Sequence, residues 1–189
     1  MTAQIASLPI HQRALLNEQD FLLLNDSGAF DGYRKTELID GEIYYMNSQY
    51  RRHAMVKTDV YDAIRDRLRA SGSSLRVVQE ASVGIGPHDM PEPDVFLTSQ
   101  PYGAGVFPGD SIALIIEVAD STQAMDLGKK LEIYARAAVP EYWVLDTQAC
   151  IAHQHWQPEG TAYAQRREIA FGQAITAVTL PDLTVTLPD

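Results

Sequence analysis

Two acidic residues stand at the ends of two predicted strands, where their carboxylates could act together. Asp94 follows Pro93 at the start of a strand predicted over 94–98, and Glu117 closes an apolar run over 112–116. Burying an unpaired carboxylate is costly, so each residue needs a cationic partner or a metal ion. Neighbouring strands would let the two carboxylates share a cation, and hard oxygen ligands favour Mg²⁺ or Mn²⁺. Alternatively, each acid caps a strand end near solvent and accepts backbone N–H groups.

A lysine on the helix predicted over 122–138 could complete this group. At about 100° per residue, the buried direction of that helix is set by a stripe of Leu127, Leu131, Tyr134 and Ala138. Lys129 points almost opposite to this stripe, whereas Lys130 lies roughly 70° from its centre and could reach the strand ends. The alternative for Lys130 is an i,i+4 ion pair with Asp126, which would need no functional explanation.

Four further positions are candidates for accessory or nucleic-acid-binding roles. Glu80 ends the preceding strand and is either an extra metal ligand or an exposed strand acid. His53 opens a long predicted helix directly after Arg51 and Arg52. A helix N-terminus beside arginines is a natural anion site, so we expect Arg51 and Arg52 to contact nucleic-acid phosphate. The alternative for the basic stretch over 51–76 is a solvated helix face. His53 either contacts phosphate or metal-bound water, or packs and caps the helix.

The elements that must position these residues form a mixed α/β pattern. A hairpin over 33–46 turns at Asp40-Gly41, a strong two-residue turn signal. An amphipathic helix over 50–70 follows, then strands over 75–85, 94–98 and 111–119, the second helix, and a strand over 141–146. The sequence therefore predicts one domain over 1–189, with a mixed central sheet flanked by helices, a core order αβββαβ, an N-terminal hairpin and extra C-terminal strands.

Several short motifs along this order resemble the Uma2 (DUF820) family of endonucleases. Each motif is weak alone, but together they cover roughly residues 20 to 155 in the family's order and at similar spacing. They are Glu37-Leu38-Ile39-Asp40-Gly41-Glu42-Ile43, His53, Pro93-Asp94-Val95, Ile116-Glu117-Val118, Ser121-Thr122, Asp126, Lys130-Leu131, Tyr134 and Val139-Pro140-Glu141-Tyr142-Trp143-Val144-Leu145-Asp146.

The resemblance implies a restriction-endonuclease-like fold of the PD-(D/E)XK superfamily, with Mg²⁺ or Mn²⁺ as cofactor. Asp94 and Glu117 match the two metal-binding acids of that pattern. The sequence departs from it two residues after Glu117, where Ala119 stands in place of the lysine. The matching lysine is Lys130 on the following helix, which helical geometry selects independently. Glu37 matches a hairpin glutamate of the family and is a candidate third carboxylate on the metal side.

The function implied is metal-dependent hydrolysis of phosphodiester bonds in nucleic acid, with DNA as the expected substrate. The alternative is a catalytically silent nuclease fold that acts as a binding or assembly module. Family resemblance favours a homodimer, and the apolar run over 142–145 and the strand-rich C-terminus could supply its surface.

Composition sets limits on this interpretation. The 189 residues carry a formal net charge of −10, which argues against a protein whose affinity depends on neutralising phosphates. However, seven of the 15 lysines and arginines lie within residues 51–76. The single Cys150 excludes a disulfide framework and favours a reducing compartment. No apolar run is long enough to cross a bilayer, and Met1–Ile10 lacks the pattern of a signal peptide, so we expect a cytoplasmic protein without a membrane partner.

Overall fold

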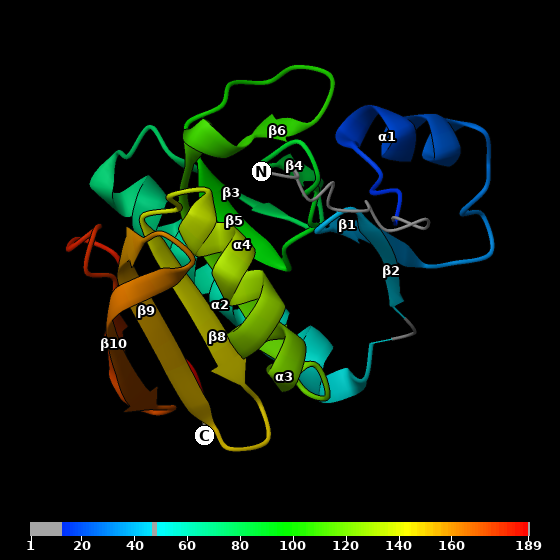
Figure 1. Cartoon of the computed structure of the whole chain (residues 1–189). Coiled ribbons are helices and arrows are strands. Elements are labelled where there is room, and N and C mark those ends of the chain that lie inside the picture. The colour runs from blue at the N-terminus through cyan, green and yellow to red at the C-terminus, as the bar shows by residue number, and fades with distance from the viewer. Residues whose placement is uncertain (1–12, 47–48, 189) are drawn as a thin grey trace, which may run out of the picture.

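A six-stranded mixed sheet forms the centre of the computed structural model, which describes residues 13–46 and 49–188 (Figure 1). The segment Met1–Ile10, for which the sequence predicts no signal peptide, lies outside the described residues. The strand order is β10-β9-β8-β7-β5-β3, in which β7 and β8 run parallel and the other neighbours antiparallel. The strands are β3 (Arg76–Gln79), β5 (Val95–Thr98), β7 (Ile112–Ala119), β8 (Glu141–Asp146), β9 (Ile151–Glu159) and β10 (Ala162–Ala170).

Helices cover both faces of this sheet, as the sequence predicts (Figure 1). Helix α2 (Arg51–Ser71) packs on one face and ends at Gly72, whose φ of 66° suits the left-handed cap. The small pair β11 (Ala174–Thr176) and β12 (Thr184–Thr186) covers part of the same face. The opposite face is covered by three successive helical pieces, α3 (Gln123–Met125), the π-helical turn η2 (Asp126–Lys130) and α4 (Leu131–Arg136).

Side-chain alternation along the strands assigns residues to the two faces. On β7, Leu114 and Ile116 pack with the α2 side, whereas Ile115 and Ala119 pack with the α4 side. Glu117 has the parity of Ile115 and therefore faces the π-helical turn and α4. The predicted core order αβββαβ is confirmed by α2, β3, β5, β7, the α3–α4 segment and β8.

The predicted hairpin is formed by β1 (Lys35–Ile39) and β2 (Glu42–Met46). Asp40 and Gly41 both have positive φ, 49° and 73°, as a two-residue turn of this kind requires. A loop over 86–93 then attaches the hairpin to the sheet, since Leu38 and Met90 exchange backbone hydrogen bonds of 3.2 and 2.8 Å. This attachment brings the buried side of β1 beside the start of β5. Helix α1 (Glu18–Asp26), capped by Asn17, packs against the hairpin and the 86–93 loop.

Three sequence-based expectations about local structure need correction. The strand predicted over 75–85 is interrupted at Glu80, which has a φ of 48°. Its second part is the short strand β4 (Val83–Gly84), which pairs with β6 (Phe107–Pro108). The 3-10 turn η1 (Gly109–Ser111) follows β6. The helix predicted to reach Ala138 ends at Arg136, because Ala138 is in the left-handed region. The apolar run over 142–145 is wholly buried in β8 between β7 and β9, so it offers no dimer surface.

Candidate active site

Asp94 and Glu117 lie side by side on adjacent strands and are almost completely buried, each 2% exposed. The pairing of Val95 with Ile116 places the two acids opposite one another at the end of the β5–β7 ladder. Asp94 Oδ2 accepts the backbone N–H of Val118 at 2.9 Å, and Glu117 Oε2 accepts that of Asp94 at 3.3 Å. The acids therefore do accept backbone N–H groups, as the alternative interpretation proposes, but they do so together and away from solvent.

Lys130 connects this pair to the hairpin. Its Nζ donates to Glu117 Oε1 at 3.0 Å and to Glu37 Oε1 at 2.9 Å, and the lysine is 2% exposed. The i,i+4 ion pair with Asp126 is not formed, since the Asp126 carboxylate instead accepts the Thr122 hydroxyl at 2.6 Å. The π-helical turn gives Lys130 this position, and such turns recur at functional sites.

Lys129 points away from the buried cluster, as its helical direction predicts, but it is half-buried against the hairpin rather than fully solvated. Its Nζ donates to the Tyr44 hydroxyl at 2.7 Å and lies 3.5 Å from Glu42 Oε2, both on β2. The neighbouring lysines of the turn thus contact different carboxylates, and only Lys130 enters the buried cluster.

Three basic side chains surround the other oxygen of Asp94. His53 Nε2 is 3.3 Å from Asp94 Oδ1, and the ammonium groups of Lys35 and Lys57 are each 4.0 Å from the same atom. Lys35 Nζ is also 3.9 Å from Glu37 Oε1, and it has no hydrogen-bond partner within the part of the chain that the structure describes. The side chain of His53 thus packs into the site beside Asp94 as well as belonging to the first turn of α2.

The electrostatics of the cluster separate the two acids. Burial favours the neutral form of Asp94, but the hydrogen bond to His53 and the charge of Lys35 outweigh it and hold its pKa far below the ordinary value. Burial raises the pKa of Glu117 to about 7, the charge of Lys130 opposes the shift, and the charge of Asp94 adds to it. Burial alone would lower the pKa of Lys130, but Glu117 and Glu37 raise it well above the ordinary value.

Glu37 is held in its ionised form by its surroundings. Although burial opposes ionisation, the charges of Lys130 and Lys35 and the backbone N–H of Glu92, at 2.8 Å, together lower the pKa of Glu37. The buried cluster thus holds charged side chains of both signs, with Asp94 and Glu37 anionic and Lys130 cationic at neutral pH. Its carboxylates Asp94, Glu117 and Glu37 lie against the ammonium groups of Lys35, Lys57 and Lys130.

The remaining predicted residues lie farther out. Glu80 is about a third exposed and accepts Lys57 Nζ at 2.5 Å, so it reaches the cluster through that lysine. Arg51 and Arg52 are exposed at the start of α2, and Arg52 donates to the carbonyl of Thr147 at 3.0 Å. No contact joins either arginine to the buried carboxylates among the residues that the structure describes.

Sequence reasoning missed four members of the cluster, which are Lys35, Lys57, Asp126 and Tyr134. Two of them had a usable signal. Lys35 precedes Glu37 by two residues and so shares its strand face, and Lys57 follows His53 by one helical turn. Tyr134 was named as a stripe residue and as part of the family pattern but was given no role in the site, yet its hydroxyl donates to Glu117 Oε1 at 2.8 Å. Asp126 was named as an ion-pair partner and as part of the family pattern, and it is itself buried, which raises its pKa.

The oxygen donors of this cluster fit a divalent cation. The charge of Asp94 contributes to the raised pKa of the buried Glu117. A further positive charge beside these two acids would therefore stabilise their ionised forms. Mg²⁺ is commonly held by one or two carboxylates, with water and substrate phosphate as the other ligands. Within residues 13–46 and 49–188, no group of three or more His, Cys, Asp or Glu side chains is arranged as a metal site. Asp94 and Glu117 could thus supply two ligands, and the set would be completed from outside the chain.

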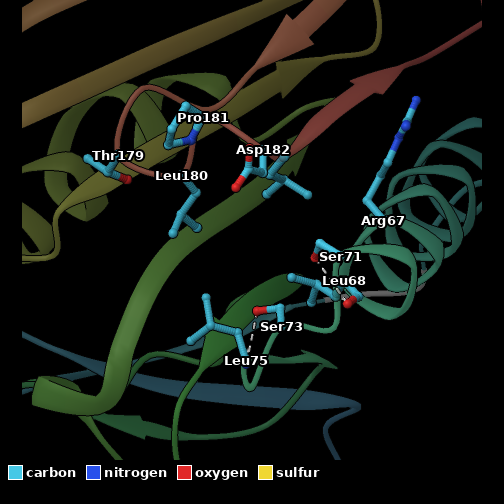
Figure 2. Close-up of a pocket in the computed structure, with 10 residues that line it drawn as sticks. Arg67, Leu68, Ser71, Ser73, Leu75, Thr179, Leu180, Pro181 and Asp182 are labelled. Atoms are coloured by element: carbon cyan, nitrogen blue, oxygen red, sulfur yellow. Dashed lines mark hydrogen bonds between the residues drawn. The ribbon is translucent and has the colours of Figure 1, made fainter.

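A surface hollow of about 340 Å³ opens beside the cluster. His53 is one of its lining residues, together with Tyr45, Tyr50 and the 120–122 segment. A second hollow of about 260 Å³ lies between the end of α2 and the 179–183 loop, where Leu75 and Leu180 point toward one another (Figure 2). The first hollow is the one relevant to the candidate site, because its lining residue His53 contacts Asp94, whereas no residue that contacts Asp94 or Glu117 lines the second.

Comparisons with known proteins agree on one family. The Uma2 family, described as "Putative restriction endonuclease", matches residues 19–188. A solved structure described as a "putative nuclease belonging to DUF820", from Anabaena variabilis, is similar in fold with a TM-score of 0.59 at 14% identity, over 76% of this chain and 80% of that chain. A comparison with curated proteins finds no match. In the described part of the chain, no helix is both long and apolar enough to cross a membrane.

Proposed function

Because the chain belongs to the Uma2 family, we propose that it is a divalent-metal-dependent endonuclease that hydrolyses phosphodiester bonds in DNA. The observation that carries this proposal is the buried Lys130, which bridges Glu37 and Glu117 directly beside Asp94. Asp94, Glu117 and Lys130 come from separate elements and meet in one place. Two acids could hold a divalent ion there, and the lysine would add a fixed positive charge, which suits phosphodiester hydrolysis.

Asp94 and Glu117 would hold Mg²⁺ or Mn²⁺. The bound ion would supply positive charge for the phosphate oxygens and lower the pKa of a water molecule. Glu37 would support the site as a third carboxylate, since Lys130 connects it to Glu117. Glu80 would act only as an accessory group, because it reaches the cluster through Lys57.

Lys130 would act as a fixed positive charge. Its raised pKa keeps the ammonium group protonated at neutral pH, so it can stabilise developing negative charge but cannot accept a proton. Its two carboxylate partners hold it in place before substrate arrives, which lowers the cost of organising the site. The opposite pKa shifts of Asp94 and Glu117 mean that Asp94 would be ionised at neutral pH, whereas Glu117 would still carry a proton in part of the molecules.

His53 and the two arginines would contact the substrate side. His53 Nε2 faces Asp94 while the same residue lines the open hollow, so it can link a bound phosphate or water to the cluster. Arg51 and Arg52, exposed at the N-terminal end of α2, would contact backbone phosphates.

The test combines metal binding with cleavage of covalently closed circular DNA, double-stranded and single-stranded, because cleavage of a closed circle requires an endonuclease. Asp94→Asn, Glu117→Gln and Lys130→Met should abolish cleavage, and the first two should weaken Mg²⁺ or Mn²⁺ binding by calorimetry. Asp110→Asn is the matched control, an exposed acid outside the cluster. Circular dichroism must show that each variant is folded.

Two results would reject this function. A folded wild-type protein that binds neither ion would lack the proposed cofactor. Cleavage that survives in all three variants would come from a contaminant or another site. Metal binding without any cleavage would favour the alternative, a catalytically silent nuclease fold that acts as a binding or assembly module.

The proposal includes a homodimer in the cytoplasm. The exposed strand β10, one of the two edges of the sheet, could contact a second copy, whereas the buried β8 could not. The single cysteine supports a reducing compartment. Sedimentation equilibrium would decide the oligomeric state.

A further inference from the structure

The hollow beside the cluster has aromatic walls. Tyr45 on β2 and Tyr50 before α2 line it and are 58% and 73% exposed. The ring of Tyr33 lies against that of Tyr45, with centroids 4.6 Å apart and planes inclined at 33°. Exposed tyrosines leave apolar ring surface in water, and paired rings extend that surface. The wall is therefore suited to bind another flat, apolar face.

Its charge does not suit a duplex backbone. None of the described residues that line the hollow is lysine or arginine, and Asp120 contributes a carboxylate. Proteins that bind duplex DNA neutralise several phosphates with lysine and arginine, and the whole chain carries a net charge of −10. A ligand in this hollow must therefore be held mainly by contacts other than ion pairs.

The hollow leads to the buried acids through one residue. His53 belongs to its lining, and His53 Nε2 is 3.3 Å from Asp94 Oδ1. The imidazole ring of His53 thus connects the aromatic wall to the carboxylate cluster. A ligand on the wall would be held at the entrance to the cluster.

We propose that this hollow binds an unpaired nucleobase stacked on Tyr45, so the substrate class is nucleic acid with single-stranded segments. The inference rests on the proposed function, because it assigns the substrate of that site. Every base presents a π-face that stacks on an aromatic ring without regard to sequence. In an uninterrupted duplex the bases are stacked on one another, so only an unpaired or flipped base can use the wall.

The test measures binding separately from cleavage. Fluorescence anisotropy follows short labelled oligonucleotides without divalent ions, as single-stranded DNA, single-stranded RNA and fully paired DNA. We expect the wild type to bind single strands more tightly than the duplex, and the DNA and RNA arms show whether the 2′-hydroxyl matters. Loss of one base stack in Tyr45→Ala should weaken single-strand binding about 5- to 150-fold.

Two variants show whether the effect is stacking. Tyr45→Phe keeps the ring and should bind single strands as the wild type does. Tyr102→Ala removes a tyrosine that is 91% exposed but lies beside Arg76 in a different hollow, and it should leave binding unchanged.

The outcomes separate the inference from the proposed function. Tyr45-dependent binding of single strands by a protein that cleaves nothing would support the base site and reject the nuclease. Equal binding of single strands and duplex, unaffected by Tyr45→Ala, would overturn the base site even if DNA is cleaved. A changed sedimentation coefficient in Tyr45→Ala with unchanged oligonucleotide binding would also overturn it, because the face would then belong to a second copy of the chain.

Discussion

The affinity for a divalent cation should depend steeply on pH near neutrality, because one of its proposed ligands is held partly protonated. Burial raises the pKa of Glu117 to about 7, whereas that of Asp94 is held far below its ordinary value. A metal binds the ionised carboxylate, so a protonated Glu117 must lose its proton first. Ionisation increases as pH rises, and the apparent affinity must therefore increase in the same direction.

The size of the effect follows from the ionised fraction of Glu117. With a pKa of about 7, this fraction is about one-tenth at about pH 6 and about nine-tenths at about pH 8. The apparent association constant for Mn²⁺ or Mg²⁺ should therefore rise about tenfold over this range. At about pH 7, each metal ion bound should release about half a proton. A glutamate with an ordinary pKa would be ionised throughout and would give almost no change.

Isothermal titration calorimetry in buffers of different ionisation enthalpy measures both quantities. Glu117→Gln should bind the metal more weakly, with little pH dependence and no proton release. Histidine is the other side-chain type that titrates in this range, so His53→Gln is the necessary control and should keep the pH dependence. A wild-type affinity that is constant between about pH 6 and about pH 8, with no proton released, would refute the argument from the burial of Glu117.

Three substitutions, with Gly103→Ala as a control for one of them, test the structural contacts by urea unfolding. Lys130→Met leaves two buried carboxylates without their shared cation and should lower the free energy of unfolding by about 3–5 kcal/mol; a loss near zero would show that the buried pairing is not formed. Gly41 has a φ of 73°, and in Gly41→Ala the new Cβ would lie 2.6 Å from the Cβ of Leu15. This substitution should lower the free energy of unfolding by at least about 1 kcal/mol. In Gly103→Ala the new Cβ meets nothing within 4 Å, so that free energy should not change. Glu141→Ala removes a fully buried carboxylate that accepts four hydrogen bonds and should cost at least about 2 kcal/mol; wild-type stability would contradict its role in tying the 178–179 segment to β8.

The proximity of Asp94, Glu117 and Lys130 was predictable because each depends on local periodicity. An acid at the end of a buried strand stands out in an apolar run, and the helical stripe sets the direction of Lys130. The fold was predictable for the same reason. The spacing of apolar residues has a period of about two in strands and about 3.6 in helices, and the change from one to the other marks the core elements. Dimerisation through the 142–145 run was a poor inference, because an apolar strand is equally typical of a sheet centre.

The rest of the cluster depends on long-range contacts that periodicity does not contain. Glu37 reaches Lys130 only because the 86–93 loop attaches the hairpin to β5, a contact between segments some fifty residues apart. The π-helical turn was also missed, because the spacing of Leu127, Leu131, Tyr134 and Ala138 is equally compatible with an uninterrupted α-helix. Local strain, such as the positive φ of Glu80 and Ala138, follows from tertiary packing and has no signal in residues of those types.

The placement of charge explains how a chain with a net charge of −10 could act on nucleic acid. Three of the lysines are buried, where they balance buried carboxylates and cannot neutralise phosphates at the surface; they are Lys35, Lys57 and Lys130. The other twelve lysines and arginines are not buried, and the acids outside the interior still outnumber them. Under the proposed function, a substrate would then be selected by contacts at the entrance and by the metal, because long-range attraction to DNA is weak or repulsive at this charge. This balance agrees better with the proposed single base on an aromatic wall than with a long duplex footprint.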